Sequence, residues 1–303
     1  SGRSPDRRRA RPHLMEPASR GGLRHLEVSP PRLRSPSMPT HDTRVILAAA
    51  NLRDLGGIRI ADGRRVRTGL LFRAGHLSDL NETDASTVAG LGLRTVVDLR
   101  RPSEIESRPH PELGVTDVLH CQVSSDDNEF AVVANLLGDM AHQVDGPGMV
   151  EDYFRRNLTD RLDAYRPVFH LATDPDRLPL LFNCTAGKDR TGFVAGILLR
   201  LLGVDADTAM ADYLLSNEVR RHWIVEREEQ HRLVMAKRLG VGSSEVNDDQ
   251  LTALRSLLWC QASFLEASFQ AVTDTWGTWD AFRRDGLGID DDRFGAFTEK
   301  LLT

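Results

Sequence analysis

The segment between residues 178 and 202 constrains the fold of this chain more than any other. It opens with the short apolar run Leu178–Asn183, which is typical of a buried strand. It closes with Thr191–Leu202, which is apolar nearly all round and predicts a central buried helix. The loop between them starts at Cys184 and ends at Arg190. A buried strand that leads through a short loop into a buried helix is a unit of α/β folds.

Apolar patterns on either side of this segment continue the alternation of strands and helices. We expect strands at 93–99 and 115–123, helices at 81–90 and 151–170, and a hairpin turn at Asp62-Gly63. Asn81 or Thr83 is the expected N-cap of the first helix, and the sequence is helical in pattern beyond residue 207, with breaks near 240–247, 276–278 and 285–289. The chain therefore predicts an α/β fold: a central, mostly parallel sheet flanked by helices, with a C-terminal helical extension or lid at 207–303.

The first 44 residues differ in composition from the rest of the 303-residue chain. They are rich in Arg, Pro, Ser and Gly without apolar periodicity, so we expect a disordered tail at 1–44 and one domain at 45–303. Ten Arg against four acidic residues give the tail a net charge of +6, which leaves −11 for the remainder of a chain at −5. An acidic body argues against nucleic-acid binding by the folded part. The run Arg7–Arg9 could contact an acidic partner or lipid, although a solvated tail without a function is the simpler interpretation.

Cysteine usage and hydropathy indicate the compartment. The three cysteines, Cys121, Cys184 and Cys260, are few, odd in number and far apart, which argues against a disulfide framework and favours a reducing environment. Neither a CxxC nor an HxxxH pair occurs, so no zinc or other metal is expected. No apolar run of 18 residues predicts a membrane span, and the tail has no apolar core typical of a signal peptide. We therefore expect a cytoplasmic protein, with secretion by another route left open.

The loop from Cys184 to Arg190 combines three properties that suit phosphate chemistry. Successive backbone N–H groups at a helix N-terminus can converge on an anion. The planar guanidinium of Arg190 can bind two phosphate oxygens at once. The same positive field favours the thiolate of Cys184, which would then lie beneath a bound phosphorus atom. The hydroxyl of Thr191 could donate to the thiolate or to the phosphocysteine as it leaves.

A Cys and an Arg at this spacing are weak evidence alone, and the context carries the argument. Gly187 would allow a tight turn, and Gly192 would allow the helix to start close to its neighbours. A nucleotide-binding P-loop needs Lys followed by Ser or Thr, whereas Lys188 is followed by Asp189. A small buried Cys184 without a function would leave both glycines and Arg190 unexplained.

At these residues the chain resembles the protein tyrosine phosphatase superfamily, whose loop reads His-Cys, five residues, Arg, Ser or Thr. It is most similar to a bacterial branch with an Ala-Gly-Lys-Asp-Arg-Thr-Gly loop, which includes mycobacterial tyrosine phosphatase B and related triple-specificity and phosphoinositide phosphatases. Further segments that match the branch are Asn51–Gly57, Leu71–Leu77, Val97–Arg100 and Asp212–Asn217. The resemblance spans residues 45–303 and implies a tyrosine-phosphatase-like fold whose helical tail covers the pocket.

The resemblance also implies the activity and the residues that perform it. We expect hydrolysis of phosphotyrosine, phosphoserine or phosphothreonine, or phosphoinositide monoesters through a phosphocysteine, without a cofactor. Cys184 is the expected nucleophile, and the expected phosphate-binding loop consists of Thr185, Ala186, Gly187, Lys188, Asp189 and Arg190. Lys188 would add positive charge at the rim of the loop for acidic substrates or merely steer anions. Asn51, Arg53 and Asp54 are expected to brace the site.

Two features of the sequence leave alternatives open. No Trp-Pro-Asp tripeptide occurs, so Asp189 is the expected proton donor, and Asp98, at the end of a predicted strand, is the second candidate. Asp98 would otherwise pair with Arg100 or Arg53. Asn183 stands where the superfamily has His, which keeps a non-catalytic phosphate- or phosphopeptide-binding module as the alternative function. A sulfurtransferase also uses a loop cysteine, but the Arg-Thr-Gly continuation and the long helical tail argue against it.

Overall fold

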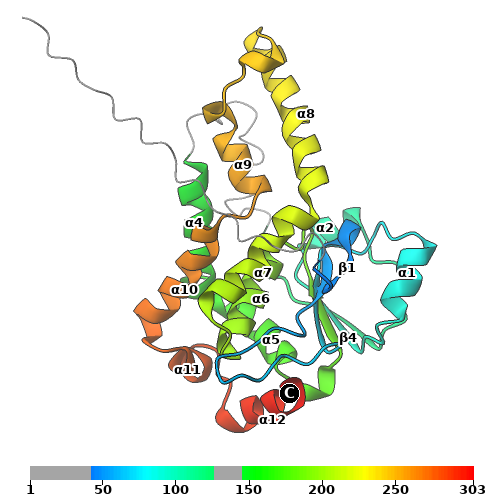
Figure 1. Cartoon of the computed structure of the whole chain (residues 1–303), viewed down its shortest axis with the longest axis vertical. Coiled ribbons are helices and arrows are strands. Elements are labelled where there is room, and N and C mark those ends of the chain that lie inside the picture. Colours follow the sequence, from blue (N-terminus) through cyan, green and yellow to red (C-terminus); the bar gives the residue numbers. More distant parts are fainter. Residues whose placement is uncertain (1–41, 126–144) are drawn as a thin grey trace, which may run out of the picture. The chain divides into compact units, whose positions relative to one another are not determined.

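A single mixed sheet forms the centre of the structure (Figure 1). The computed structural model describes residues 42–125 and 145–303. Six strands lie in the order β1-β2-β3-β6-β4-β5. They are β1 (Val45–Leu47), β2 (Leu52–Asp54), β3 (Leu71–Ala74), β4 (Thr95–Asp98), β5 (Asp117–His120) and β6 (Leu180–Asn183). The pairings of β3 with β6, β6 with β4, and β4 with β5 are parallel, whereas β1 and β2 join antiparallel to one another and to β3. The expected mostly parallel sheet is therefore confirmed.

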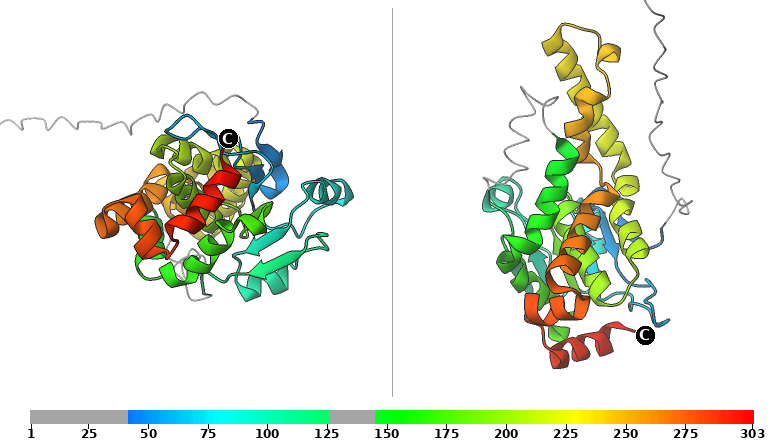
Figure 2. Two further views of the ribbon diagram at one scale, coloured as in Figure 1. Left: turned by 90° about the horizontal axis from the view of Figure 1, so that it is seen from below. Right: turned by 90° about the vertical axis from the view of Figure 1, so that its left-hand side faces the viewer.

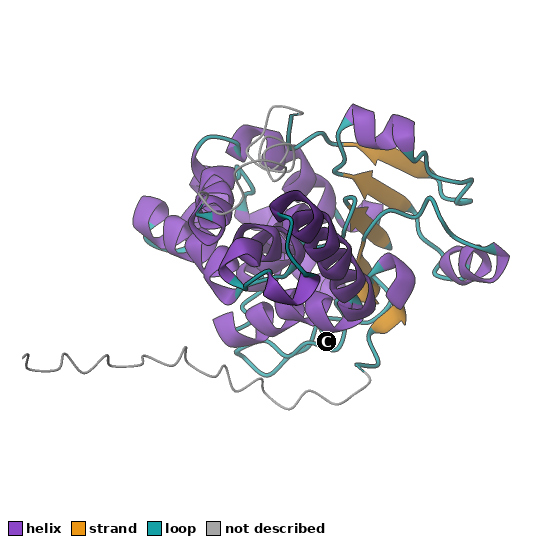
Figure 3. Ribbon diagram, turned by 90° about the horizontal axis from the view of Figure 1, so that it is seen from above, coloured by secondary structure: helices purple, strands orange, loops and turns teal. Residues whose placement is uncertain are grey.

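Helices cover both faces of this sheet (Figure 3). In chain order the α-helices of the described residues are α1 (Glu82–Ala89), α2 (Pro102–Ser107), α4 (Gly146–Thr159), α5 (Leu162–Ala172), α6 (Asp189–Leu201), α7 (Ala206–Val219), α8 (Arg221–Leu239), α9 (Thr252–Leu258), α10 (Ala262–Trp276), α11 (Trp279–Ala281) and α12 (Asp291–Leu301). The larger group, which includes α4 to α7 and α10, lies on one face, and α1 lies on the other. The expected α/β class is confirmed.

Strand β6 shows why its sequence is a continuous apolar run. Successive side chains of a strand point to opposite faces. Leu180 and Phe182 enter the larger core with Phe193 of α6, while Leu181 enters the smaller core with Val88 of α1. Because both faces are covered, every position of β6 is buried. The strand thus fixes the position of the residue that follows it, Cys184.

Several elements differ from the sequence prediction. The expected single helix at 151–170 is wrong: α4 ends at Thr159, and α5 begins at Leu162. The helix breaks at the polar pair Asp160-Arg161, although Leu158 and Leu162 on either side of the break are both buried and keep the spacing of one helical face. Asn81 is confirmed as the N-cap of α1, since its side chain accepts from the N–H of Asp84. The expected disordered tail at 1–44 falls almost entirely on residues outside the described part of the chain.

The C-terminal helices divide into two groups. Helix α10 packs against α4 and α6 and buries Phe264 and Leu265 in the larger core. Helices α8 and α9 form a pair that extends from the body (Figures 1 and 2). Ile224 of α8 packs there against Leu254 and Leu258. The helical extension is thus partly core and partly a projecting pair, and the lid remains a prediction. None of the helices in the described residues is long and apolar enough to cross a membrane.

Candidate active site

The loop that follows β6 lies at the carboxyl end of the parallel strands, the edge at which open α/β sheets bind ligands. Cys184 comes directly after β6 and is buried, with 2% of its surface exposed. Gly187 has φ of +67°, and a Cβ there would lie 2.5 Å from the backbone nitrogen of Gly75. Only glycine therefore fits this turn. Helix α6 begins two residues later, at Asp189, so its N-terminus faces the loop.

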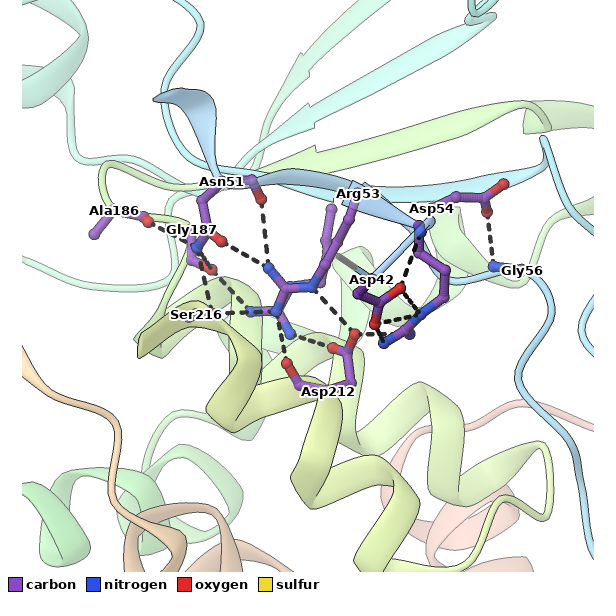
Figure 4. A network of polar contacts seen from close by, with 11 residues as sticks. Asp42, Asn51, Arg53, Asp54, Gly56, Ala186, Gly187, Asp212 and Ser216 are labelled. Atoms are coloured by element: carbon purple, nitrogen blue, oxygen red, sulfur yellow. Dashed lines mark hydrogen bonds and ion pairs between the residues drawn. The ribbon is translucent and has the colours of Figure 1, made fainter. Parts of the chain in front are cut away.

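A polar network holds the loop from behind (Figure 4). The side-chain Nδ2 of Asn51 donates to the carbonyl oxygens of Ala186 and Gly187 at 3.2 and 3.1 Å. Arg73 Nη2 donates to the same Gly187 oxygen at 2.8 Å. In a trans peptide the C=O and the following N–H point in opposite directions. Binding these carbonyls on one side therefore directs the N–H groups of the peptides toward the other side, where an anion would lie.

Asp212 of α7 is the centre of this network. Its carboxylate accepts from Arg53 Nε at 3.1 Å, Arg73 Nη1 at 2.6 Å and Arg44 Nη1 at 3.1 Å. Burial acts to raise the pKa of Asp212, but the charges of Arg53, Arg73 and Arg44 outweigh it and lower the pKa. Burial, together with the charge of Arg73, lowers the pKa of Arg53 to about 10. Two fully buried arginines, Arg53 and Arg73, thus share one buried carboxylate, and these hydrogen bonds hold both guanidinium groups in place behind the loop.

Glu104 of α2 orients the arginine at the end of the loop. Its two carboxylate oxygens accept from Arg190 Nη1 and Nη2 at 2.7 and 2.8 Å, and Thr185 Oγ1 donates to the same carboxylate at 2.5 Å. Burial acts to lower the pKa of Arg190, but the charges of Cys184 and Glu104 raise it overall. The Glu104 carboxylate thus binds the edge of the Arg190 guanidinium that is formed by Nη1 and Nη2. The second donor edge, formed by Nε and Nη2, points in another direction.

Lys188 and Asp189 form a pair at the start of α6. Lys188 Nζ donates to Asp189 Oδ1 at 2.6 Å. Only 2% of the Lys188 side chain is exposed, against 20% for Asp189. Lys188 is therefore not a solvated cation at the rim of the loop, because its charge is held inside by the carboxylate of its neighbour.

Comparisons with known proteins agree with this geometry. The family model described as the tyrosine phosphatase family matches residues 45–303. The chain belongs to the tyrosine phosphatase family. A Cupriavidus necator protein that carries the name of a tyrosine-protein phosphatase is 33% identical over 243 residues, which cover 80% of this chain and 82% of that protein. The triple specificity protein phosphatase PtpB of Mycobacterium tuberculosis is 28% identical over 271 residues, which cover 80% of this chain and 93% of PtpB. The chain is accordingly a hydrolase of the protein-tyrosine-phosphatase type.

Asn183 is the position at which this tyrosine phosphatase departs from the superfamily pattern. Its Nδ2 donates to Asp98 Oδ1 at 3.3 Å. Asp98 also accepts from Arg100 Nε and Nη2, and His110 Nε2 lies 3.0 Å from its Oδ2. Burial acts to raise the pKa of Asp98, but these contacts with His110 and Arg100 lower it to about 2. Asp98 is thus an ionised partner of Asn183 and Arg100, which supports the structural interpretation of this residue.

The other supporting residues lie at different distances from the phosphatase loop. Asn51 and Arg53 belong to the network behind it, whereas Asp54 accepts from the N–H groups of Gly56 and Gly69 and so braces the turn after β2. Thr191 Oγ1 donates to the carbonyl of Ala74 at 3.3 Å, so its hydroxyl proton is directed toward β3. The sequence did not single out Glu104, Arg73 or Asp212, although the last two lie in segments that match the family.

Replacing Glu104 by Gln is expected to lower kcat/KM for an aryl phosphate about tenfold. The amide keeps the shape but offers only one oxygen acceptor to the guanidinium, so Arg190 loses one charge-assisted contact. Steady-state kinetics check this, with the inhibition constant of inorganic phosphate as a second readout. Glu106 on the same helix is exposed, and Glu106→Gln serves as the control. Equal kinetics for Glu104→Gln and the control would show that Arg190 does not depend on Glu104.

Proposed function

We propose that this phosphatase hydrolyses the phosphate monoester of phosphotyrosine and that the reaction passes through a phosphocysteine on Cys184. One observation carries the proposal: a buried cysteine lies at the base of a loop whose carbonyls are bound from behind, beside an arginine already oriented by a carboxylate. The inward N–H groups and Arg190 would bind the three phosphate oxygens. That geometry suits attack on phosphorus from the side opposite the leaving oxygen.

The reaction divides into two steps at the same phosphorus. The Cys184 thiolate forms the S–P bond while the P–O bond to the leaving group breaks, and Asp189 gives its proton to the departing oxygen. A water molecule then attacks the phosphocysteine and gives a proton back to Asp189, which breaks the S–P bond. Inorganic phosphate leaves, and the thiolate is restored.

The substrate range is the second part of the proposal. The name of the mycobacterial relative describes a triple specificity phosphatase. We include phosphoserine, phosphothreonine and phosphoinositide monoesters as substrates because the donors of the loop bind the phosphoryl group and not the leaving group.

Turnover in the presence of EDTA and capture of the intermediate test the mechanism. We expect the purified chain to hydrolyse p-nitrophenyl phosphate equally well with and without EDTA. Acid quenching during turnover, followed by mass spectrometry, is expected to find one phosphoryl group on the peptide that contains Cys184. Activity that depends on added metal, or a phosphoryl group on another residue, would contradict the proposal.

A phosphate-binding module without turnover is the second candidate, and Asn183 is the observation that favours it. The neutral amide cannot supply the charge that a histidine beside the nucleophile could carry. Binding of a phosphotyrosine peptide to the wild-type chain, combined with no release of phosphate over hours, would select this second function.

A further inference from the structure

One largely buried histidine has no part in the mechanism described so far. His110 lies in the connection from α2 to β5, and 10% of its side chain is exposed. Its Nε2 lies 3.0 Å from Oδ2 of Asp98, whereas its Nδ1 is buried and has no hydrogen-bond partner in residues 42–125 and 145–303. A buried polar atom without a partner is unfavourable. The contact with Asp98 is therefore what explains the position of this ring.

A line of contacts leads from His110 to the proposed nucleophile. The other oxygen of the same carboxylate, Asp98 Oδ1, accepts from Asn183 Nδ2 at 3.3 Å. That Nδ2 also donates to the carbonyl oxygen of Cys184 at 3.5 Å. Asn183 is the last residue of β6, and Asp98 is its register partner on β4. The sheet thus fixes Asp98, Asn183 and Cys184 relative to one another, and His110 joins them from a connecting segment.

The net charge of this group depends on His110. Arg100 forms an ion pair with Asp98, with Nη2 at 2.8 Å from Oδ2, and both side chains are almost fully buried. One guanidinium and one carboxylate leave no net charge. A protonated His110 would therefore add one uncompensated positive charge beside Asn183 and Cys184. A positive charge near a thiol favours its thiolate form.

The approach of His110 to Asp98 suits a charged ring. An ionised carboxylate oxygen only accepts hydrogen bonds, so the ring nitrogen beside it must carry a proton. The contact has the distance of an ion pair without the alignment of a hydrogen bond. The attraction is therefore mainly between charges, and it is strongest when Nδ1 is protonated as well.

His76, on the side of β3, does not supply this charge. Arg108 Nη1 lies 3.0 Å from His76 Nε2, and a guanidinium only donates, so this ring nitrogen accepts and the ring is neutral. Burial lowers the pKa of His76; the charge of Asp79 acts in the opposite direction, and that of Arg108 adds to the effect of burial. His76 therefore stays uncharged at a pH at which an ordinary histidine would carry a proton.

The side of β5 contributes two further titratable groups. His120 Nε2 donates to the carbonyl oxygen of Arg100 at 2.6 Å, but the His120 side chain is exposed, so that solvent screens its charge. Burial and the charge of Asp98 raise the pKa of Cys121, which keeps this thiol neutral. Among the described residues around Asp98, His110 is thus the largely buried group whose charge can change near neutral pH.

We propose that His110 is a positioning residue of this phosphatase. Through Asp98 and Asn183 it holds the backbone at Cys184, and its protonated ring favours the thiolate at acidic pH. This role rests on the proposed function, in which Cys184 is the nucleophile. The thiolate can also be measured without turnover, so the role of His110 and the proposed function can fail separately.

The pH dependence of His110→Gln tests the proposal. Gln keeps an N–H donor of similar reach for Asp98 but never carries a charge. We expect kcat/KM for p-nitrophenyl phosphate to fall about fivefold at pH 5 and less than about twofold at pH 8, because a histidine loses its charge between these values. Alkylation of Cys184 by iodoacetamide, followed by mass spectrometry of its peptide, should slow by a similar factor at pH 5. His222→Gln, at an exposed position of α8, is the matched control and should behave like the wild type at both pH values.

A double variant tests whether His110 acts through Asp98. In the Asp98→Asn background, His110→Gln is expected to add less than about a twofold loss at pH 5, because the contact is already removed. Losses that multiply would show that His110 acts independently of Asp98 and would overturn the proposal. Identical pH profiles of His110→Gln and the wild type would overturn it too, as would a loss of equal size at pH 5 and pH 8, which indicates support of the fold alone. A wild-type chain that hydrolyses no phosphate, but whose Cys184 is still alkylated more slowly in His110→Gln at pH 5, would remove the proposed function and leave the effect of His110 in place.

Discussion

Cys184→Ser is expected to lower kcat/KM for p-nitrophenyl phosphate by about 10⁴-fold or more. Sulfur is a far better nucleophile toward phosphorus than a serine hydroxyl, which keeps its proton at neutral pH, so the variant offers a much weaker nucleophile. The loop carbonyls stay bound by Asn51 and Arg73, and Arg190 stays paired with Glu104. Phosphate binding should therefore survive. Kinetics measure the first effect, and titration with a phosphotyrosine peptide measures the second.

The chain provides a matched control for this change. Cys121 is half-buried and lies at the end of β5, where burial and the charge of Asp98 raise its pKa. Cys121→Ser makes the same chemical replacement and should retain most of the activity. Undiminished turnover in Cys184→Ser would contradict the assignment of the nucleophile. A comparable loss in both variants would show that a general effect of the replacement, and not chemistry at Cys184, is responsible.

The strand, loop and helix around Cys184 could be predicted because their signals are local. The apolar run before the loop and the apolar helix after it are visible within 25 residues, and β6 and α6 begin within two residues of the predicted positions. The family motifs added the segment around Asn51. The same local reasoning placed the predicted helix at 151–170 wrongly, because the interruption at Asp160-Arg161 does not alter the apolar period enough to be seen.

The residues that were missed act across long distances in the sequence. Glu104 meets Arg190 only because β4 pairs with β6, which brings α2 to the mouth of the loop. Arg73 and Asp212 lie 139 residues apart and meet because β3 and α7 both pack beside α6. A carboxylate on a short helix after a strand has no signal of its own. Lys188 was misplaced for a related reason: burial depends on what surrounds the loop, and the loop sequence does not contain that information.

Asp189→Asn is expected to lower kcat/KM for phosphotyrosine by about 10²- to 10³-fold. The tyrosine leaving group departs as a strong base unless it receives a proton, and the amide has none of the required acidity. The same variant should lose less than about tenfold on p-nitrophenyl phosphate, because a nitrophenolate leaves without protonation. The dependence of the loss on the leaving group is the readout, since a purely structural effect on the Lys188 contact would lower both rates equally.

Asp98→Asn supplies the comparison that decides between the two carboxylates. With its pKa lowered to about 2, Asp98 is ionised across the working range and holds no proton to give. Its replacement should weaken the contacts with Asn183 and Arg100 and lower both rates by a similar factor. If Asp98→Asn showed the loss that depends on the leaving group, and Asp189→Asn kept its activity at acidic pH, Asp98 would be the proton donor. Asp189 would then have only the role of holding Lys188.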